Sequence, residues 1–141
     1  MLYKEFVPYE PSLDMKELGF DEPCFGEYRQ WDGNEPWLQL YQNLVDCSTD
    51  PADYEYTQEA LAPTFSQAFR WFREKYKLHN GIYPYYDEYE FQIKDFRLPT
   101  STPINGGLMP YEEAELECLI KLIEIANKIK YSSSDVPTYY N

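Results

Sequence analysis

The chain has 141 residues, of which 25 are acidic and 12 basic, so its formal net charge is −13 with the single histidine neutral. Its 15 Tyr, 8 Phe and 3 Trp residues argue against a disordered chain, because disordered sequences are poor in large apolar side chains. The excess of carboxylates argues against sequence-independent binding to duplex nucleic acid and against binding to anionic membranes, since both depend on Lys and Arg.

The first part of the chain is predicted to form a short helix and then a β-hairpin. Glu10 to Leu18 is predicted to be helical, because a proline suits its first turn and a glycine directly follows it. Cys24 to Trp31 and Trp37 to Gln42 flank Asp32-Gly33-Asn34, which is a strong hairpin turn signal. In the second arm the two leucines share one face of the strand. Asn43 to Glu59 has no clear period and is predicted to be a loop.

The middle of the chain contains the clearest helix signal and a second hairpin. Pro63 to Leu78 is amphipathic, and one stripe at the helical period is formed by Phe65, Ala68, Phe69, Phe72 and Tyr76. Asn80-Gly81 is predicted to end this helix and to turn the chain. Ile82 to Tyr86 and Tyr89 to Phe96 are predicted to form the hairpin, whose first arm contains a proline and is therefore expected at a sheet edge. Leu98 to Met109 is rich in turn residues and has room for one more short strand.

The last predicted helix begins near Pro110 and runs to Lys130. Its charged residues occupy one narrow stripe, so its wide apolar surface must be covered on more than one side. Either it is the central helix of the domain, or part of it meets a second copy of the chain. Together the elements predict one α+β domain over residues 1–130: a short N-terminal helix, two hairpins that form a mainly antiparallel sheet, an amphipathic helix and a long apolar C-terminal helix. Residues 131–141 are predicted to be a flexible tail.

The sequence contains no pattern that nominates catalysis, a metal site or a cofactor site. Three widely spaced cysteines (Cys24, Cys47 and Cys118) and the lone His79 provide neither a disulfide framework nor a zinc ligand set. No Ser or Cys stands in a nucleophile motif, and no phosphate-binding glycine pattern occurs. We therefore expect a protein that is not an enzyme and needs no cofactor. No export signal and no span of roughly 20 apolar residues is expected. The odd number and wide spacing of the cysteines favour a protein that resides in a reducing cytoplasm.

Three basic residues are predicted to lie on one ridge of the amphipathic helix, opposite its aromatic stripe. Arg70, Arg73 and Lys77 form this ridge, and Trp71 lies at another edge of the helix. Arginine binds phosphate or carboxylate in bidentate fashion, and Trp offers a stacking surface. These four residues are therefore a candidate site for a nucleotide-like ligand. The alternative is a solvated helix face that nearby carboxylates neutralise.

The second hairpin is crowded with tyrosines. Tyr83, Tyr85, Tyr86 and Tyr89 cannot all point inward, because successive side chains of a strand point to opposite faces. Exposed tyrosines suit a binding surface, since they bring a large contact area at low entropic cost. With Trp37 of the first hairpin, they are the candidate partner-binding residues. The alternative is that these rings pack across the sheet.

Three stretches of the chain resemble a known family. They are Lys16–Gly26 (KELGFDEPCFG), Ala62–Tyr76 (APTFSQAFRWFREKY) and Tyr111–Leu119 (YEEAELECL). In order and spacing they resemble a family of small proteins that is common in tailed phages and mobile elements of Bacteroidota. The resemblance brings no catalytic residue and no activity. It implies that the matching stretches form a scaffold, and that the variable segments Glu27–Leu61 and His79–Pro110 carry recognition.

The sequence favours binding over catalysis as the function. We expect a phage accessory protein in the host bacterial cytoplasm that binds a host protein, and the phage context favours inhibition of a defence component. Its negative charge would steer it to a basic site. Two alternatives stay open. The first is a binder that sequesters a nucleotide or a nucleotide-derived signal, and the second is a minor virion or replication accessory protein.

Overall fold

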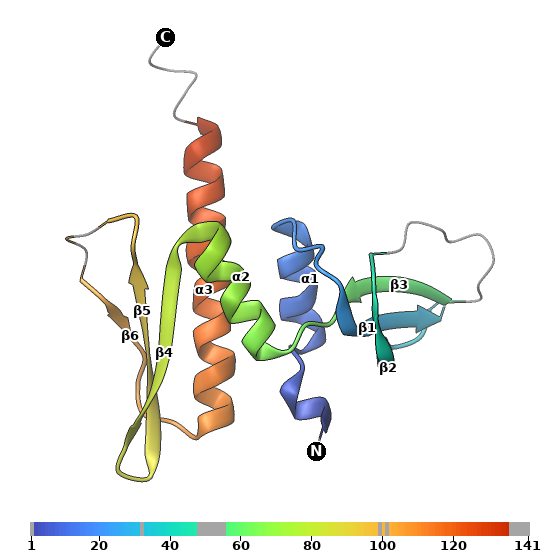
Figure 1. The fold of residues 1–141 in the computed structure, drawn as a ribbon, viewed down its shortest axis with the longest axis horizontal. Coiled ribbons are helices and arrows are strands. Elements are labelled where there is room, and N and C mark those ends of the chain that lie inside the picture. The colour runs from blue at the N-terminus through green and yellow to red at the C-terminus, as the bar shows by residue number, and fades with distance from the viewer. Residues whose placement is uncertain (1, 32, 48–55, 99, 101, 136–141) are drawn as a thin grey trace. The chain divides into compact units, whose positions relative to one another are not determined.

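The computed structural model describes residues 2–31, 33–47, 56–98, 100 and 102–135 (Figure 1). Within these residues it contains three α-helices and two three-stranded antiparallel sheets, which confirms the predicted α+β class. The chain divides into two compact units, Met1–Ala68 and Phe69–Asn141, and each unit holds one sheet. Each predicted hairpin therefore belongs to a sheet of its own. That residues 1–130 act as a single domain stays a prediction.

The first unit consists of a short helical segment, one α-helix and a sheet with the strand order β2-β1-β3. Its elements are η1 (Leu2–Glu5), α1 (Tyr9–Glu17), β1 (Cys24–Trp31), β2 (Trp37–Val45) and β3 (Tyr56–Leu61). The predicted N-terminal helix is confirmed as α1. Gly19 follows it with a φ of 100°, a backbone conformation that glycine adopts without strain. The first hairpin is confirmed as β1 and β2, which pair antiparallel.

A small core holds the first unit together. Phe6 and Tyr28 are buried in one cluster, and Leu38 and Leu40 of β2 pack against it. The shared face that the sequence predicts for these two leucines is therefore the one that faces the core. The hydroxyl of Tyr28 donates a hydrogen bond of 2.7 Å to the carbonyl of Val7. Burial raises the pKa of this hydroxyl to about 12, so Tyr28 stays a donor at any ordinary pH.

The loop predicted over Asn43–Glu59 is wrong at both ends. β2 extends beyond the predicted arm, and β3 covers the end of the predicted loop and pairs with β1. The register of this pairing changes between Tyr28 and Arg29, which leaves Glu59 out of the pairing. Such a bulge interrupts the alternation of side chains, so the strand shows no period of two in the sequence. Residues 48–55 lie outside the described residues.

The predicted amphipathic helix is confirmed as α2 (Phe65–Tyr76). Thr64 caps it, because its Oγ1 accepts a hydrogen bond of 3.2 Å from the amide of Gln67. The helix ends before the predicted Leu78, since Lys77 adopts a φ of 60° and leads into the next strand. The predicted stripe is buried along the whole helix: Phe65, Ala68, Phe69, Phe72 and Tyr76.

The second unit holds a sheet with the strand order β4-β5-β6 and a long helix. Its elements after α2 are β4 (Leu78–Tyr85), β5 (Glu88–Asp95), β6 (Ile104–Asn105) and α3 (Tyr111–Asp135). β4 is an edge strand, as its proline predicts, and β6 is the short extra strand. The turn predicted at Asn80-Gly81 is wrong, because both residues lie inside β4. The chain enters β4 instead through Lys77, which has a φ of 60°. The second hairpin is confirmed as β4 and β5, and its turn at Tyr86, also with a φ of 60°, lies one residue before the predicted position.

The long helix α3 packs against β4 and β5, beside the sheet in Figure 1. Its buried side chains are Ala114, Cys118, Leu119, Leu122, Ile123 and Ala126. Ile120 is 42% exposed, so contact of α3 with a second copy of the chain stays a prediction. The helix continues past the predicted end at Lys130 to Asp135, and residues 136–141 of the predicted tail lie outside the described residues. No helix in the described part of the chain has the length and apolar character needed to span a membrane.

Candidate partner-binding surface

The sheet of the second unit has two chemically different faces. β4 and β5 pair residue by residue, with Ile82 opposite Phe91 and Asn80 opposite Ile93. Phe91 and Ile93 are buried, so these pairs lie on the face toward α3. Because side chains alternate along a strand, the residues between them lie on the opposite face, which we term the outer face.

The outer face carries two tyrosines opposite two glutamates. Tyr83 pairs with Glu90, and Tyr85 pairs with Glu88. Directly opposite residues of an antiparallel pair have Cβ atoms about 4.5–5.5 Å apart, so each tyrosine side chain begins beside a glutamate side chain on the neighbouring strand. Tyr83 is 49% exposed and Tyr85 is 54% exposed. Both rings are therefore open to a binding partner.

Tyr86 extends this aromatic surface to the tip of the hairpin. It lies in the turn between β4 and β5 and is 91% exposed. Its ring stands edge-on to that of Tyr85, with 4.9 Å between the ring centroids. We term Tyr83, Tyr85 and Tyr86 the tyrosine surface. Their exposure is confirmed, and their role in binding stays a prediction.

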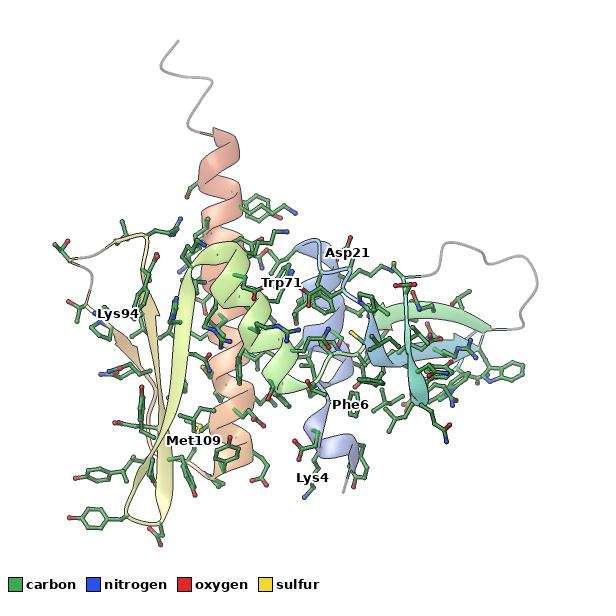
Figure 2. The ribbon with its side chains drawn as sticks, in the orientation of Figure 1. Lys4, Phe6, Asp21, Trp71, Lys94 and Met109 are labelled. Atoms are coloured by element: carbon green, nitrogen blue, oxygen red, sulfur yellow. The ribbon has the colours of Figure 1, made fainter. Side chains whose placement is uncertain are left out.

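The fourth predicted tyrosine, Tyr89, lies on the other face of the hairpin. It is half-buried, and its ring stands edge-on to that of Tyr111 at the start of α3, with 5.1 Å between the centroids. Its backbone exchanges two hydrogen bonds of 2.8 and 3.0 Å with Met109, which Figure 2 labels beside the sheet. Tyr89 therefore anchors the tip of the hairpin and does not belong to the tyrosine surface.

Gly81 explains why a turn-like sequence lies inside a strand. A Cβ atom at this position would collide with the ring of Tyr83, at 2.5 Å from Cζ and 2.7 Å from Cε2. The ring of Tyr83 therefore lies over Gly81 on the outer face. A glycine within a strand often serves such a close approach, and here it makes room for one ring of the tyrosine surface.

Four carboxylates lie at the end of the unit that holds the tip of the hairpin. Asp87 and Glu88 lie at the tip of the hairpin, and Glu112 and Glu113 lie in the first turn of α3, which the contact between Tyr89 and Tyr111 brings to the same end of the unit. These four carboxylates are exposed. In the described part of the chain, none of the four forms an ion pair or a side-chain hydrogen bond. Their charge is therefore left for a partner to neutralise.

The predicted ligand ridge on α2 is only partly assembled. Arg70 and Arg73 are exposed on the helix, whereas Lys77 follows the helix end in a different backbone conformation. Trp71 is 6% exposed, and its ring packs edge-on against that of Phe72, with 5.0 Å between the centroids. A buried ring offers no free face to a nucleotide. The structure therefore does not support the stacking role that the sequence predicts for Trp71.

Trp37 belongs to the first unit, on β2. It is half-buried, and the centroid of its ring lies 6.3 Å from that of Trp31. On the neighbouring strand β1, the buried carboxylate of Glu27 accepts hydrogen bonds from Arg29 and, at 3.2 Å, from Gln58 of β3. The bond from Gln58 ties β1 to β3, whereas the bond from Arg29 lies within β1. A partner-binding role for Trp37 stays a prediction and is separate from the tyrosine surface.

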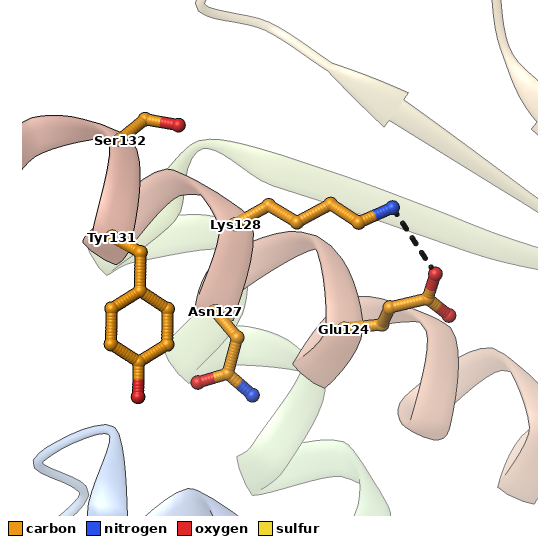
Figure 3. A pocket seen from close by; sticks show the side chains of 5 residues that line it. All are labelled: Glu124, Asn127, Lys128, Tyr131 and Ser132. Atoms are coloured by element: carbon orange, nitrogen blue, oxygen red, sulfur yellow. Dashed lines mark hydrogen bonds and ion pairs between the residues drawn. The ribbon is translucent and has the colours of Figure 1, made fainter.

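The C-terminal part of α3 borders a shallow hollow of about 440 Å³, which the sequence does not predict (Figure 3). It is lined by Glu124, Asn127, Lys128, Tyr131 and Ser132. The ammonium group of Lys128 donates a hydrogen bond of 3.3 Å to Glu124 Oε1. Hydrogen bonds from Lys121 and Lys128 hold the pKa of the Glu124 carboxyl below its ordinary value. The two charged side chains that line the hollow are therefore already paired with each other.

The cysteines offer little reactivity. Cys24 and Cys118 are buried, and burial raises the pKa of each thiol to about 12, whereas Cys47 is exposed. Among the residues that the structure describes, no three His, Cys, Asp or Glu side chains are grouped so that they could hold a metal ion.

Comparison with known proteins identifies no relative of this chain. No protein-family model matches the chain, and neither a curated protein nor a solved structure shows significant similarity to it. The resemblance to the phage family therefore stays a prediction that rests on the three sequence stretches. The function has to be inferred from the geometry and charge of the site.

Proposed function

We propose that this chain is a non-enzymatic accessory protein of a tailed phage or mobile element that binds a host protein in the bacterial cytoplasm, and that the bound protein is a defence component which it inhibits. One observation carries the proposal: Tyr83, Tyr85 and Tyr86 are exposed on the outer face and tip of a hairpin whose other face packs against α3. The resemblance of the three sequence stretches supplies the phage context.

The physical chemistry of tyrosine supports a protein partner. A tyrosine ring contributes a large contact area, and fixing its two side-chain torsions costs little entropy. Such residues often dominate the binding energy of protein interfaces. The hairpin is also held in place before binding, because β5 is bonded to Met109 through Tyr89 and its buried face packs against α3. A surface that is already ordered loses less entropy when it binds.

Charge supports the same proposal. The chain carries a formal net charge of −13, and the four exposed carboxylates at this end of the unit have no cationic partner in the described part of the chain. A negatively charged protein surface accelerates association with a positively charged surface of a partner protein. A basic host protein is therefore the favoured partner.

Affinity purification from a Bacteroidota lysate, followed by quantitative mass spectrometry, tests the proposal. The full chain is compared with a Tyr85→Ser/Tyr86→Ser variant and with a Tyr3→Ser/Tyr131→Ser control, which removes two exposed tyrosines outside the tyrosine surface. We expect one host protein to be captured by the full chain and by the control, and to be lost with the hairpin variant. Equal capture by all three proteins, or equal loss with both variants, would contradict the proposal.

A further inference from the structure

We infer that the outer face of the β4–β5 hairpin binds an extended segment of the partner protein in which arginines occupy alternate positions. This inference rests on the proposed function, because it names the chemistry of the segment that the tyrosine surface binds. It follows from the pairing of the rings with carboxylates, from the spacing of these pairs and from the charge around them.

Each of the two cross-strand pairs has the composition of a guanidinium site. Tyr83 lies opposite Glu90, and Tyr85 lies opposite Glu88, so both members of a pair are on the outer face. A guanidinium group is planar, stacks on an aromatic ring and donates paired hydrogen bonds to a carboxylate. A lysine ammonium group is a compact and strongly hydrated charge, which makes neither contact as well. Each pair therefore favours arginine over lysine.

The spacing of the two pairs matches an extended chain. Tyr83 and Tyr85 are two residues apart on β4, as are Glu88 and Glu90 on β5. Two residues of a strand span about 6.6–6.8 Å, which is the spacing of the two pairs along the backbone. In an extended partner, side chains on the same side repeat at the same distance. Arginines at alternate positions of an extended segment can therefore reach both pairs at once.

The charge around the two pairs is not neutralised by the hairpin itself. Residues 78–93 contain no Lys or Arg. The first lysine along β5 is Lys94, four residues beyond Glu90, and Figure 2 labels it well away from Met109, which bonds to the other end of the strand. The ammonium group of Lys94 lies 5.7 Å from the centroid of the Phe96 ring. The carboxylates of Glu88 and Glu90 are therefore available to cations of a partner.

Synthetic peptides test this inference on the full chain by fluorescence anisotropy at physiological ionic strength. The first is a short peptide in which serine and arginine alternate, and the second has lysine in place of every arginine. We expect the arginine peptide to bind about tenfold more tightly, because two guanidinium groups stack on two rings. A third peptide, with the same composition but adjacent arginines, should bind about threefold more weakly than the first, because only one of its arginines reaches a ring at a time.

Two variants separate the contribution of the tyrosine rings to peptide affinity from that of the glutamate charges. In Tyr83→Ser/Tyr85→Ser, the arginine and lysine peptides should bind with similar Kd values, since stacking is lost and attraction by charge remains. In Glu88→Gln/Glu90→Gln, both peptides should bind about tenfold more weakly. The stability of the fold is not at issue, because the two tyrosines and Glu88 are exposed and Glu90 is half-exposed.

A matched control separates a local site from the effect of net charge. Glu5→Gln/Glu74→Gln removes the same two charges from exposed positions outside the hairpin, so the affinity for the arginine peptide should change by less than about twofold. Equal binding of the arginine and lysine peptides, or an equal loss of affinity in both charge variants, would overturn the inference.

The two proposals fail in different ways. If a host protein is captured through the tyrosines while the peptides show no preference for arginine, the inference about arginine is wrong and the proposed function stands. If the peptides behave as expected while no host protein depends on the hairpin tyrosines for capture, the proposed function is wrong and the guanidinium site stands.

Discussion

Gly106 lies where the ring of Phe91 leaves no room for a side chain. A Cβ atom on Gly106 would overlap this ring, and even the ring's Cζ would be only 2.7 Å away. Phe91 is 6% exposed and lies on the face toward α3, so its ring cannot swing into solvent. The amide of Gly106 also donates a hydrogen bond of 2.9 Å to the carbonyl of Phe91, which fixes the two backbones. At the next residue, Gly107, the same Cβ atom would have nothing within 4 Å.

Gly106→Ala is therefore expected to lower the free energy of unfolding, and Gly107→Ala is not. Overpacking a filled site costs about 1–3 kcal/mol. Replacing glycine by alanine also restricts the unfolded chain, which stabilises the folded state by about 0.4–1 kcal/mol. For Gly106→Ala the net destabilisation is about 1–2 kcal/mol, whereas Gly107→Ala receives only the stabilising effect. The two variants should differ by about 2 kcal/mol, although the same methyl group is added one residue apart.

Urea unfolding followed by circular dichroism measures this difference. With a dependence of about 1–3 kcal/mol per molar urea, the midpoints of the two alanine variants should lie about 1 M apart. A Phe91→Leu background is the control, since the smaller side chain removes the overlap and most of the penalty of Gly106→Ala should disappear. Equal midpoints for Gly106→Ala and Gly107→Ala, or an unchanged penalty in the Phe91→Leu background, would refute the reasoning.

Two further predictions concern titratable groups. A thiol reagent at mildly alkaline pH should label only Cys47 in the folded protein, because burial raises the pKa of the Cys24 and Cys118 thiols to about 12. In urea, the reagent should label all three cysteines. Fast labelling of all three in the folded protein would contradict this prediction. Hydrogen bonds from Arg97 hold the pKa of the Asp95 carboxyl below its ordinary value, so their stabilisation is present above pH about 4 and is lost as the pH falls through the folded-state pKa. Asp95→Asn should therefore lower the free energy of unfolding in urea at neutral pH and lower it less as the pH falls below about 4; a loss that does not change with pH would speak against it.

The sequence predicts correctly those helices and strands in which apolar residues recur at a regular spacing without interruption. Phe65, Phe69 and Phe72 of α2 recur at helical spacing, and all three are buried. Phe91 and Ile93 of β5 alternate with polar residues, and both are buried. In each case one face of the element meets the core and the other meets water, so the pattern is visible without knowledge of the partner elements.

Elements whose local pattern depends on contacts with another segment are missed or misplaced. β3 pairs with β1 across a change of register that leaves Glu59 out, so no alternation appears in its sequence. Asn80-Gly81 has the sequence of a turn, yet Gly81 makes room for the ring of Tyr83 within a strand. The turn from α2 into β4 is made instead by Lys77 with a φ of 60°, an uncommon conformation for a residue other than glycine, which local signals do not predict.

The candidate site is predictable only in part for the same reason. Alternation establishes that the hairpin tyrosines cannot all point inward, but the identity of the residue opposite each ring depends on the register of β4 and β5. That register places Glu90 opposite Tyr83 and Glu88 opposite Tyr85. It follows from a turn at Tyr86 and Asp87, which lies one residue before the predicted turn. For Trp71 the prediction fails for a different reason. The buried face of α2 is wider than the predicted stripe, so the Trp71 ring is buried as well.

The pairing of tyrosine with glutamate favours a binding role for the outer face over a packing role. Aromatic residues that stabilise a sheet do so best opposite another aromatic or a β-branched residue. Tyr83 and Tyr85 instead have carboxylates opposite them and remain about half exposed, so these rings add little to the stability of the sheet. Its stability comes from the other face, where Phe91 and Ile93 are buried. The outer face can therefore change its residues without unfolding the unit, which is the freedom that a recognition surface requires.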